Sequence, residues 1–135
     1  MAWIEPKTDW KESDYFNAKD YNRFIGNLAV LKLLADELFQ TVEILSMGED
    51  KTYNSLIYAG EINAIESNLE ILNLNTYAFP IGEKMIYKDN GKTPLYSEFN
   101  RMESAILQLY TTMQAHKANL PRLAVTLGGQ KGIRV

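Results

Sequence analysis

The chain has 135 residues, a length that fits one domain with a substantial core. Hydrophobic residues make up 46% of it and charged residues 23%, a balance that is typical of a globular protein and excludes a chain disordered throughout. The net charge is −3, and the absence of cysteine excludes disulfides, thiolate metal sites and cysteine nucleophiles.

The charge is unevenly distributed. No acidic residue follows Glu103, whereas four basic residues do: Lys117, Arg122, Lys131 and Arg134. This end of the chain either meets an acidic surface, such as that of a neighbouring copy, or is simply solvated. No stretch has the length and apolarity of a membrane-spanning helix, and no signal peptide is visible, so we expect no membrane partner.

Residues 1–17 form an irregular N-terminal arm. Trp3 and Trp10 lie on either side of Pro6, and tryptophan is seldom left in a purely solvated segment. We expect the two rings to fix the arm to its own domain or to a partner. Asp14 or Asn17 could cap the helix that follows.

The first helix is predicted over residues 18–47, ending at Gly48. Its apolar residues alternate steps of three and four, the heptad spacing of a helix that packs along other helices. The stripe is wide enough to need at least two packing partners, which favours a bundle or an oligomer. This first-helix seam comprises Tyr21, Phe24, Leu28, Leu31, Ala35, Leu38, Val42 and Leu45.

A second helix is predicted over residues 57–73 and a third over 97–118, closed by Pro121. Their seams continue the same spacing. The second-helix seam is Ile62, Ile65, Leu69 and Leu72, and the third-helix seam is Phe99, Met102, Ile106, Leu109, Met113 and His116.

Two segments predict strands. Residues 84–87 suggest a short strand before the hairpin-turn signal Asn90-Gly91. Residues 122–135 suggest a β tail, with strands over 123–127 and 133–135. The predicted fold is therefore a single domain over residues 1–135, mainly α with a small β part (α+β): three helices, the first long, a β-hairpin and C-terminal strands.

Three stretches of the chain resemble one another. They begin at Tyr21, Ile62 and Phe99, at offsets of 41 and 37 residues, and each follows an acidic residue. The shared pattern is apolar-Asn-(Arg or Ala)-apolar-x-x-(Asn or Ala)-apolar-x-x-Leu. Shared helix amphipathicity explains most of it, but not the recurring asparagine and acid, which are typical of helix starts. The polar repeat positions are Asn22, Arg23, Asn63, Asn100, Arg101 and Glu103.

No catalytic or cofactor motif emerges. Gly91-Lys92-Thr93 lacks the earlier glycine of a phosphate-binding loop, where Ile86 stands instead. His116 is the lone histidine, and a metal site usually needs more imidazole or thiolate ligands. We therefore expect no enzyme, cofactor or metal. Nucleic-acid binding is disfavoured because the chain is acidic overall and lacks a basic stripe with aromatic residues.

Two phrases carry a family resemblance. Pro6-Lys7-Thr8-Asp9-Trp10 followed by Asp20-Tyr21-Asn22-Arg23-Phe24, and Glu98-Phe99-Asn100-Arg101-Met102-Glu103, resemble a pattern of tail and baseplate structural proteins of siphophages that infect Gram-positive bacteria. The chain departs from the family phrase at Ile25, Gly26 and Ala64. The resemblance covers about a third of the chain and implies no catalytic residue.

The resemblance implies a non-enzymatic bacteriophage structural or assembly protein, associated with the tail tip or baseplate. It implies self-association into a homo-oligomer or docking to other tail proteins, with synthesis in the host cytoplasm and a place in the virion after assembly. The residues expected to carry interaction and packing are Trp3, Trp10, Tyr21, Phe24, Leu28, Leu31, Leu38, Phe99, Met102 and Ile106. The alternative is a phage-encoded cytoplasmic regulator that binds a single host protein.

Overall fold

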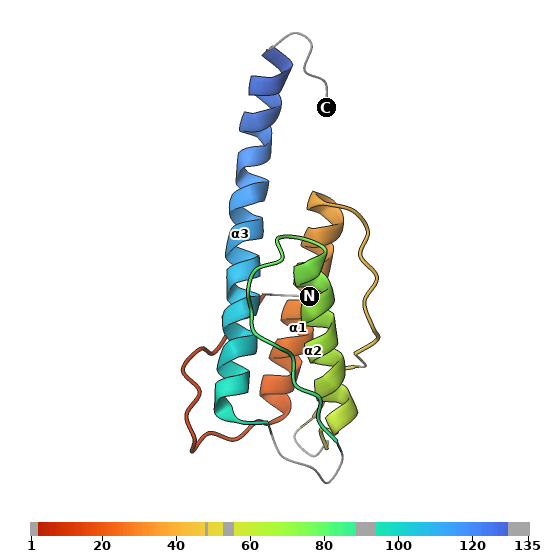
Figure 1. Cartoon of the computed structure of the whole chain (residues 1–135), viewed down its shortest axis with the longest axis vertical. Helices are drawn as coiled ribbons and strands as arrows, with labels where there is room; N and C mark the ends of the chain where they lie inside the picture. The colour runs from red at the N-terminus through yellow and green to blue at the C-terminus, as the bar shows by residue number, and fades with distance from the viewer. Residues whose placement is uncertain (1–2, 48, 53–55, 89–93, 130–135) are drawn as a thin grey trace.

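The computed structural model describes residues 3–47, 49–52, 56–88 and 94–129, with side chains up to residue 119. This part of the chain contains three helices and no strand: α1 (Ala18–Leu38), α2 (Ala59–Leu74) and α3 (Tyr96–Gly129). Figure 1 shows that the helices run in the same direction, so that all three begin at one end of the bundle.

The first turn of each helix carries an acidic residue that accepts a hydrogen bond from a nearby donor. At α1, Asn17 is the N-cap and exchanges hydrogen bonds with Asp20 in a capping box. At α2, the carboxylate of Glu61 accepts a bond of 2.8 Å from the backbone N–H of Tyr58. At α3, Glu98 accepts from the side chain of Arg101, 2.8 Å away. The acid that precedes each repeat therefore belongs to the start of a helix.

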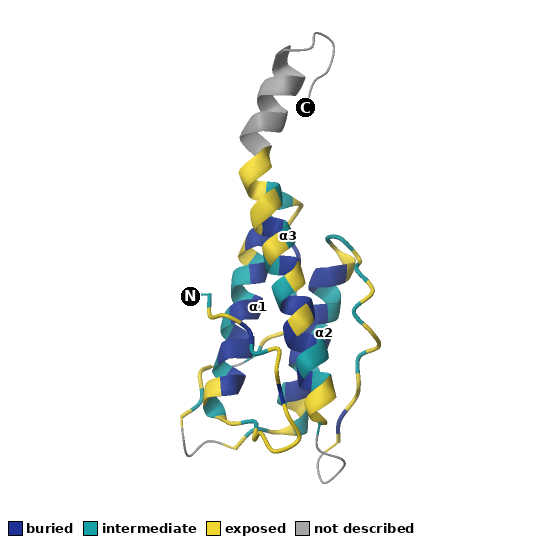
Figure 2. Ribbon diagram, turned by 90° about the vertical axis from the view of Figure 1, so that its left-hand side faces the viewer, coloured by how far each residue is buried: buried dark blue, intermediate teal, exposed yellow. Residues whose placement is uncertain are grey.

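The three seams meet in one core. The largest fully buried side chains come from equivalent positions of the three helices, so each seam is covered by the other two. Figure 2 shows the buried residues concentrated on the facing sides of the helices. These side chains include Tyr21, Phe24, Leu28, Leu31, Ile65, Leu69, Leu72, Met102, Ile106, Leu109 and Met113.

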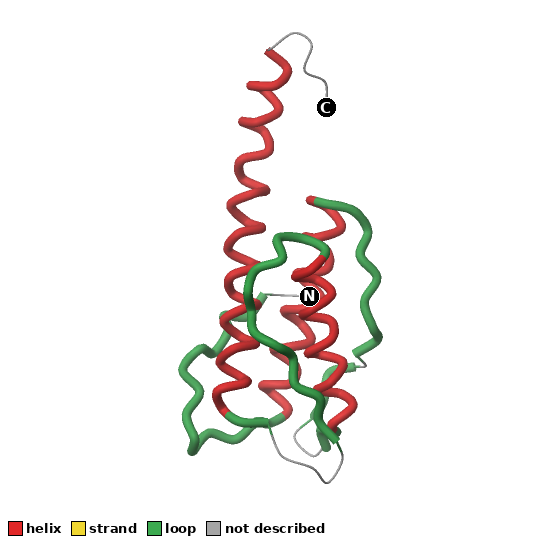
Figure 3. Tube along the Cα trace, in the orientation of Figure 1, coloured by secondary structure: helices red, strands yellow, loops and turns green. Residues whose placement is uncertain are grey.

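An extended segment runs along the bundle before each helix (Figure 3). We call these segments strap 1 (residues 3–10, before α1), strap 2 (residues 40–47 and 49–52, between α1 and α2) and strap 3 (residues 77–88, between α2 and α3). Parallel helices require such long return connections, because each chain segment must travel the length of the bundle before the next helix begins.

The predicted α+β class is wrong for the described residues, which form a helical fold. Residues 84–87 are extended but pair with no strand, because they lie along a helix. Residues 123–127 are helical, and α3 continues through Pro121 to Gly129. A proline removes only one intrahelical hydrogen bond, so the helix can resume beyond it. The predicted hairpin turn at Asn90-Gly91 and the strand over 133–135 lie outside the described residues.

The first helix is shorter than predicted. It ends at Leu38, and Val42 and Leu45 belong to strap 2. The carboxylate of Asp36 accepts a bond of 2.8 Å from the backbone N–H of Val42, which turns the chain away from the helix axis. Val42 is still buried, whereas Leu45 is about half exposed. The second helix departs from its predicted bounds by only one or two residues.

Candidate functional site: the asparagine-clamped grooves

The straps are held by asparagine side chains. In each case the carboxamide Oδ1 accepts from the backbone N–H of one strap residue, and Nδ2 donates to the carbonyl of the same residue. A carboxamide carries one acceptor and donors in the arrangement of a peptide group, so it can pair with extended backbone as a neighbouring strand would. We call each such pair of bonds a clamp.

Six clamps occur among the described residues, with bond lengths of 2.7 to 3.1 Å. They satisfy backbone groups that no helix or sheet could satisfy. The pairs are Asn27 with Ile4, Asn100 with Trp10, Asn68 with Leu45, Asn22 with Lys51, Asn63 with Tyr87, and Asn73 with Phe79.

The clamps follow the sequence repeat. The second repeat position is Asn22, Asn63 or Asn100, and each holds the strap that leads into the next helix around the bundle. The seventh position is Asn27 or Asn68, and each holds the strap that leads into its own helix. Straps 1 and 2 are therefore each held once by each of two helices, whereas strap 3 is held twice by α2, through Asn63 and Asn73.

The strap residues recur at the same spacing as well. Ile4 and Leu45 lie 17 residues before the first repeat residue of their helix, and Trp10 and Lys51 lie 11 residues before it. The third unit departs from this rule: Tyr87 lies 12 residues before Phe99, and Ala105 at the seventh position cannot form a clamp. The chain is thus three successive strap–helix units arranged around a quasi-threefold axis.

Ion pairs link α3 to each of the other two helices. The guanidinium of Arg23 on α1 donates to both carboxylate oxygens of Glu103 on α3, at 2.7 and 2.6 Å. Arg101 on α3 donates to both oxygens of Glu66 on α2, at 2.6 and 2.7 Å. In both cases an arginine at the third repeat position meets a glutamate at the fifth. Glu66 and Glu103 are each only 1% exposed.

The third interface lacks both charges. If the same pairing held at the α1/α2 interface, the third repeat position of α2 would face the fifth repeat position of α1. These residues are Ala64 and Ile25. These two residues are among the departures from the family phrase. A lone arginine or a lone glutamate at this interface would be a buried charge without a counterion, which is costly. The absence of both charges together is therefore what the pairing at the other two interfaces leads one to expect.

At each of the two buried ion pairs, an aromatic residue of a strap contacts the glutamate. The indole N–H of Trp10 donates to Glu103 over 2.6 Å, and the hydroxyl of Tyr87 lies 3.5 Å from Glu66. Burial raises the pKa of Glu66 above its ordinary value, and the Arg101 guanidinium opposes that shift. Burial and the Glu66 charge raise the pKa of Tyr87, so its hydroxyl keeps its proton and can donate.

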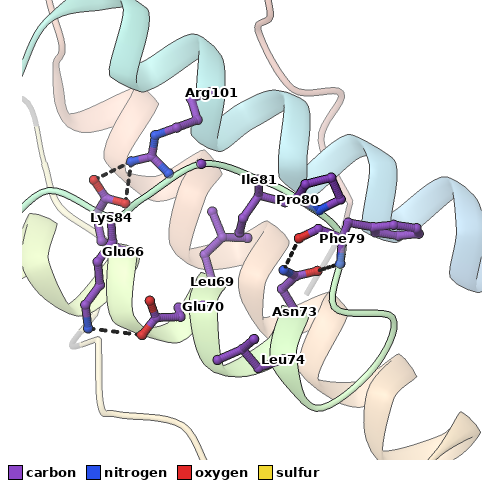
Figure 4. Close-up of a pocket in the computed structure, with 11 residues that line it drawn as sticks. Glu66, Leu69, Glu70, Asn73, Leu74, Phe79, Pro80, Ile81, Lys84 and Arg101 are labelled. Carbon is purple, nitrogen blue, oxygen red and sulfur yellow. Dashed lines mark hydrogen bonds and ion pairs between the residues drawn. The ribbon is translucent and has the colours of Figure 1, made fainter.

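A hollow of about 200 Å³ lies between α2 and strap 3 (Figure 4). Its walls are mainly apolar, and the polar groups that line it are engaged with one another: Glu66 with Arg101, Glu70 with Lys84, and Asn73 with Phe79. Strap 3 passes close to Arg101 at Gly82, where φ is +84° and an added Cβ would lie 2.8 Å from the arginine Cδ. No described side chain in this hollow offers an unpaired charge to a ligand.

The structure gives each predicted site residue a place. Ten of them are packing residues: Trp10 is buried, Trp3 stacks on Tyr110 with ring centroids 3.7 Å apart, Leu38 is half-buried, and the other seven lie in the core. The polar repeat positions form the clamps and ion pairs. Sequence reasoning assigned the recurring asparagines to helix starts, whereas they hold the straps, so it missed all six clamps and the role of Glu66. The recurrence of Asn five residues after Asn22 and Asn63 was a usable signal.

Among the described residues, no group of three or more histidines, aspartates or glutamates is placed to hold a metal ion. None of the described helices is both long and apolar enough to cross a membrane. The hydroxyl of Tyr77 lies 2.9 Å from Nδ1 of His116, which gives that ring a structural contact.

No protein family matches the chain, and neither the curated proteins nor the solved structures include a significant match to it.

Replacing Asn68 with alanine should destabilise the fold by about 2 kcal/mol, because the backbone N–H and C=O of Leu45 lose their partners. Hydrogen exchange at the amide of Leu45 should accelerate with it. The matched control is Asn75→Ala, which removes an exposed asparagine from the end of the same helix and should leave Leu45 protected. Equal losses of stability in the two variants would contradict the clamp.

Replacing Arg23 with methionine should cost about 3 kcal/mol of unfolding free energy in urea, because Glu103 stays buried without its counterion. Lys117→Met removes a cation from an ion pair about half exposed to solvent, so its urea midpoint should hardly move. If Arg23→Met were as mild as Lys117→Met, the inter-helix pair would not be a structural link.

Proposed function

We propose that the chain is a non-enzymatic structural or assembly component of a bacteriophage, of the tail-tip or baseplate type. In this proposal it acts as a rigid three-unit body that docks against copies of itself or against neighbouring tail proteins. It is made in the host cytoplasm and joins the particle on assembly. Two sets of observations support this function: what the phage-like residues do, and how α3 is placed.

The residues that resemble the phage phrase are the ones that build the strap–helix unit. Trp10, Asn22 and Arg23 form a strap anchor, a clamp and an inter-helix ion pair, and Asn100, Arg101 and Glu103 repeat these roles. The residues that carry the resemblance therefore belong to a building block, and their polar groups bind other parts of the same chain. Such a unit supports a structural task better than a catalytic one.

The observation that carries the docking proposal is the length of α3. Among the residues whose side chains are described, the contacts nearest the far end of α3 are made by His116, which meets Phe39 and Tyr77, and by Lys117, which pairs with Glu37. The helix then continues to Gly129, past the ends of α1 and α2 (Figure 1). An isolated stretch of about 12 residues is marginal as a helix in water, and Pro121 lowers its propensity further. A partner packed on this projecting end would stabilise it.

One observation favours the alternative, a regulator that binds a single host protein. The three seams, from which we expected a bundle or an oligomer, are buried against one another within one chain. Self-association through those seams is therefore not needed for the fold, and the projecting end of α3 could equally meet a different protein. The two functions predict different stoichiometries.

Deleting the residues after Ala118 should separate docking from folding. Absolute mass by light scattering should show a defined oligomer for the full chain that persists on dilution, and the loss of that oligomer for the shortened one. The shortened chain should retain cooperative thermal unfolding, because every contact between the straps and helices described above lies before residue 119. A single-chain mass for both proteins at every concentration would contradict assembly through copies and favour the regulator.

A further inference from the structure

Strap 1 makes its contacts to two helices. Its backbone is clamped at Ile4 by Asn27 of α1 and at Trp10 by Asn100 of α3. Glu103 of α3 accepts from the backbone N–H of Lys7 at 3.0 Å and from the Trp10 indole at 2.6 Å. The α1/α3 groove thus binds an extended segment at three successive points along its length.

Aromatic contacts anchor both ends of this segment. The Trp3 ring stacks on Tyr110 of α3, with an angle of 6° between the ring planes. The Trp10 ring is 4% exposed and meets Phe99, with ring centroids 4.9 Å apart. The groove therefore selects a segment with an aromatic residue near each end and backbone polar groups at fixed positions between them.

Strap 1 differs from the other straps in how it is tethered. Strap 2 joins α1 to α2 and strap 3 joins α2 to α3, whereas strap 1 precedes the three helices and leads into α1 through residues 11–17. Residues 11–15 are all exposed. The turn there is closed by two bonds of 2.9 Å between Lys11 and Asp14. Opening this one exposed turn would let strap 1 leave the groove without disturbing a helix.

We propose that strap 1 exchanges between copies of this chain, so that residues 3–10 of one molecule fill the α1/α3 groove of another. Each contact described above joins strap 1 to a helix, so exchange preserves it whichever copy supplies the strap. The equilibrium then depends on the turn and on the concentration of chains, as in domain swapping. A second copy is the occupant because it supplies the same Trp3 and Trp10 at the same spacing.

This inference goes beyond the proposed function, which places docking at the end of α3. Exchange through strap 1 would be a second and separate contact between copies. The groove is incomplete without a strap, because Trp10 covers the buried Arg23–Glu103 pair: its indole N–H bonds Glu103, and its ring centroid lies 6.0 Å from the guanidinium carbon of Arg23. A groove that loses its own strap should therefore accept another copy's strap readily.

Complementation between two variants tests the exchange. The strap variant is Trp10→Ala, and the groove variant combines Asn27→Ala with Asn100→Ala. The groove variant has an intact strap, and the strap variant has an intact groove. Unfolding the two together and refolding them should give a species of twice the 15.4 kDa of one chain. We expect it to be at least tenfold more abundant than in either variant refolded alone, and to melt at a higher temperature than either.

The control replaces the strap variant with Leu33→Ala, which alters an exposed residue of α1 outside strap 1 and its turn and leaves its own groove filled. That mixture should show no such enrichment. Only single-chain masses in the complementing mixture, or equal enrichment in both mixtures, would overturn the exchange, whether or not the separate variants fold.

Wild-type chains give a second measurement. Isotopically labelled and unlabelled chains, refolded together at high concentration, should form a mixed two-chain species by native mass spectrometry, and Trp10→Ala should reduce its yield at least tenfold. Association that is lost on deleting the residues after Ala118, yet is unchanged by Trp10→Ala, would overturn the exchange and leave the proposed function standing. Association lost only with Trp10→Ala would support the exchange and count against docking through α3.

Discussion

The bond between an asparagine carboxamide and extended backbone is the interaction on which this structure depends. Three parallel helices need two long returns, and these returns and strap 1 present peptide groups to helix surfaces that have no free backbone partner. Buried peptide groups left unpaired would cost about 1 to 3 kcal/mol each. The six clamps remove that cost, and they fix the height at which each strap crosses the bundle.

The clamps and the ion pairs together explain the sequence repeat. An apolar residue, an asparagine and a charged pair recur because each helix must present the same three things: a core side chain, a backbone anchor for a strap, and a link to the next helix. The places where the repeat fails are also informative. Ala105 replaces an anchoring asparagine, and strap 3 is instead held further along α2 by Asn73. Ala64 and Ile25 stand where an ion pair would complete the cycle.

Much of the helical core could be predicted from sequence, because heptad spacing reports directly on burial along a helix. The end of α1 could not. Val42 and Leu45 continue the heptad, and local periodicity is the same whether they extend a helix or lie along one. What favours the extended backbone at Leu45 is a contact distant in sequence. The carboxamide of Asn68, 23 residues away, pairs with the N–H and C=O of Leu45 only when that backbone is extended.

The predicted strand over residues 84–87 is wrong for a related physical reason. Residues 84–87 have the composition of a strand, and they are extended, but their hydrogen-bond partners are side chains on α2. Tyr87 is clamped by Asn63, and the N–H of Met85 lies 3.3 Å from Glu66. Composition reports a preference for extended backbone and says nothing of whether a second strand or a row of asparagines will pair with it. The recurrence of asparagine at two fixed repeat positions carried that information.

The quasi-threefold arrangement is the central claim, and it is tested most directly at the interface that lacks an ion pair. A double-mutant cycle would introduce Ile25→Glu and Ala64→Arg separately and together, with the free energy of unfolding measured in urea. If the third interface is equivalent to the other two, each single change should destabilise, and the pair should recover at least about 1 kcal/mol through mutual coupling. Purely additive losses would show that Ala64 and Ile25 do not face each other and would contradict the threefold account.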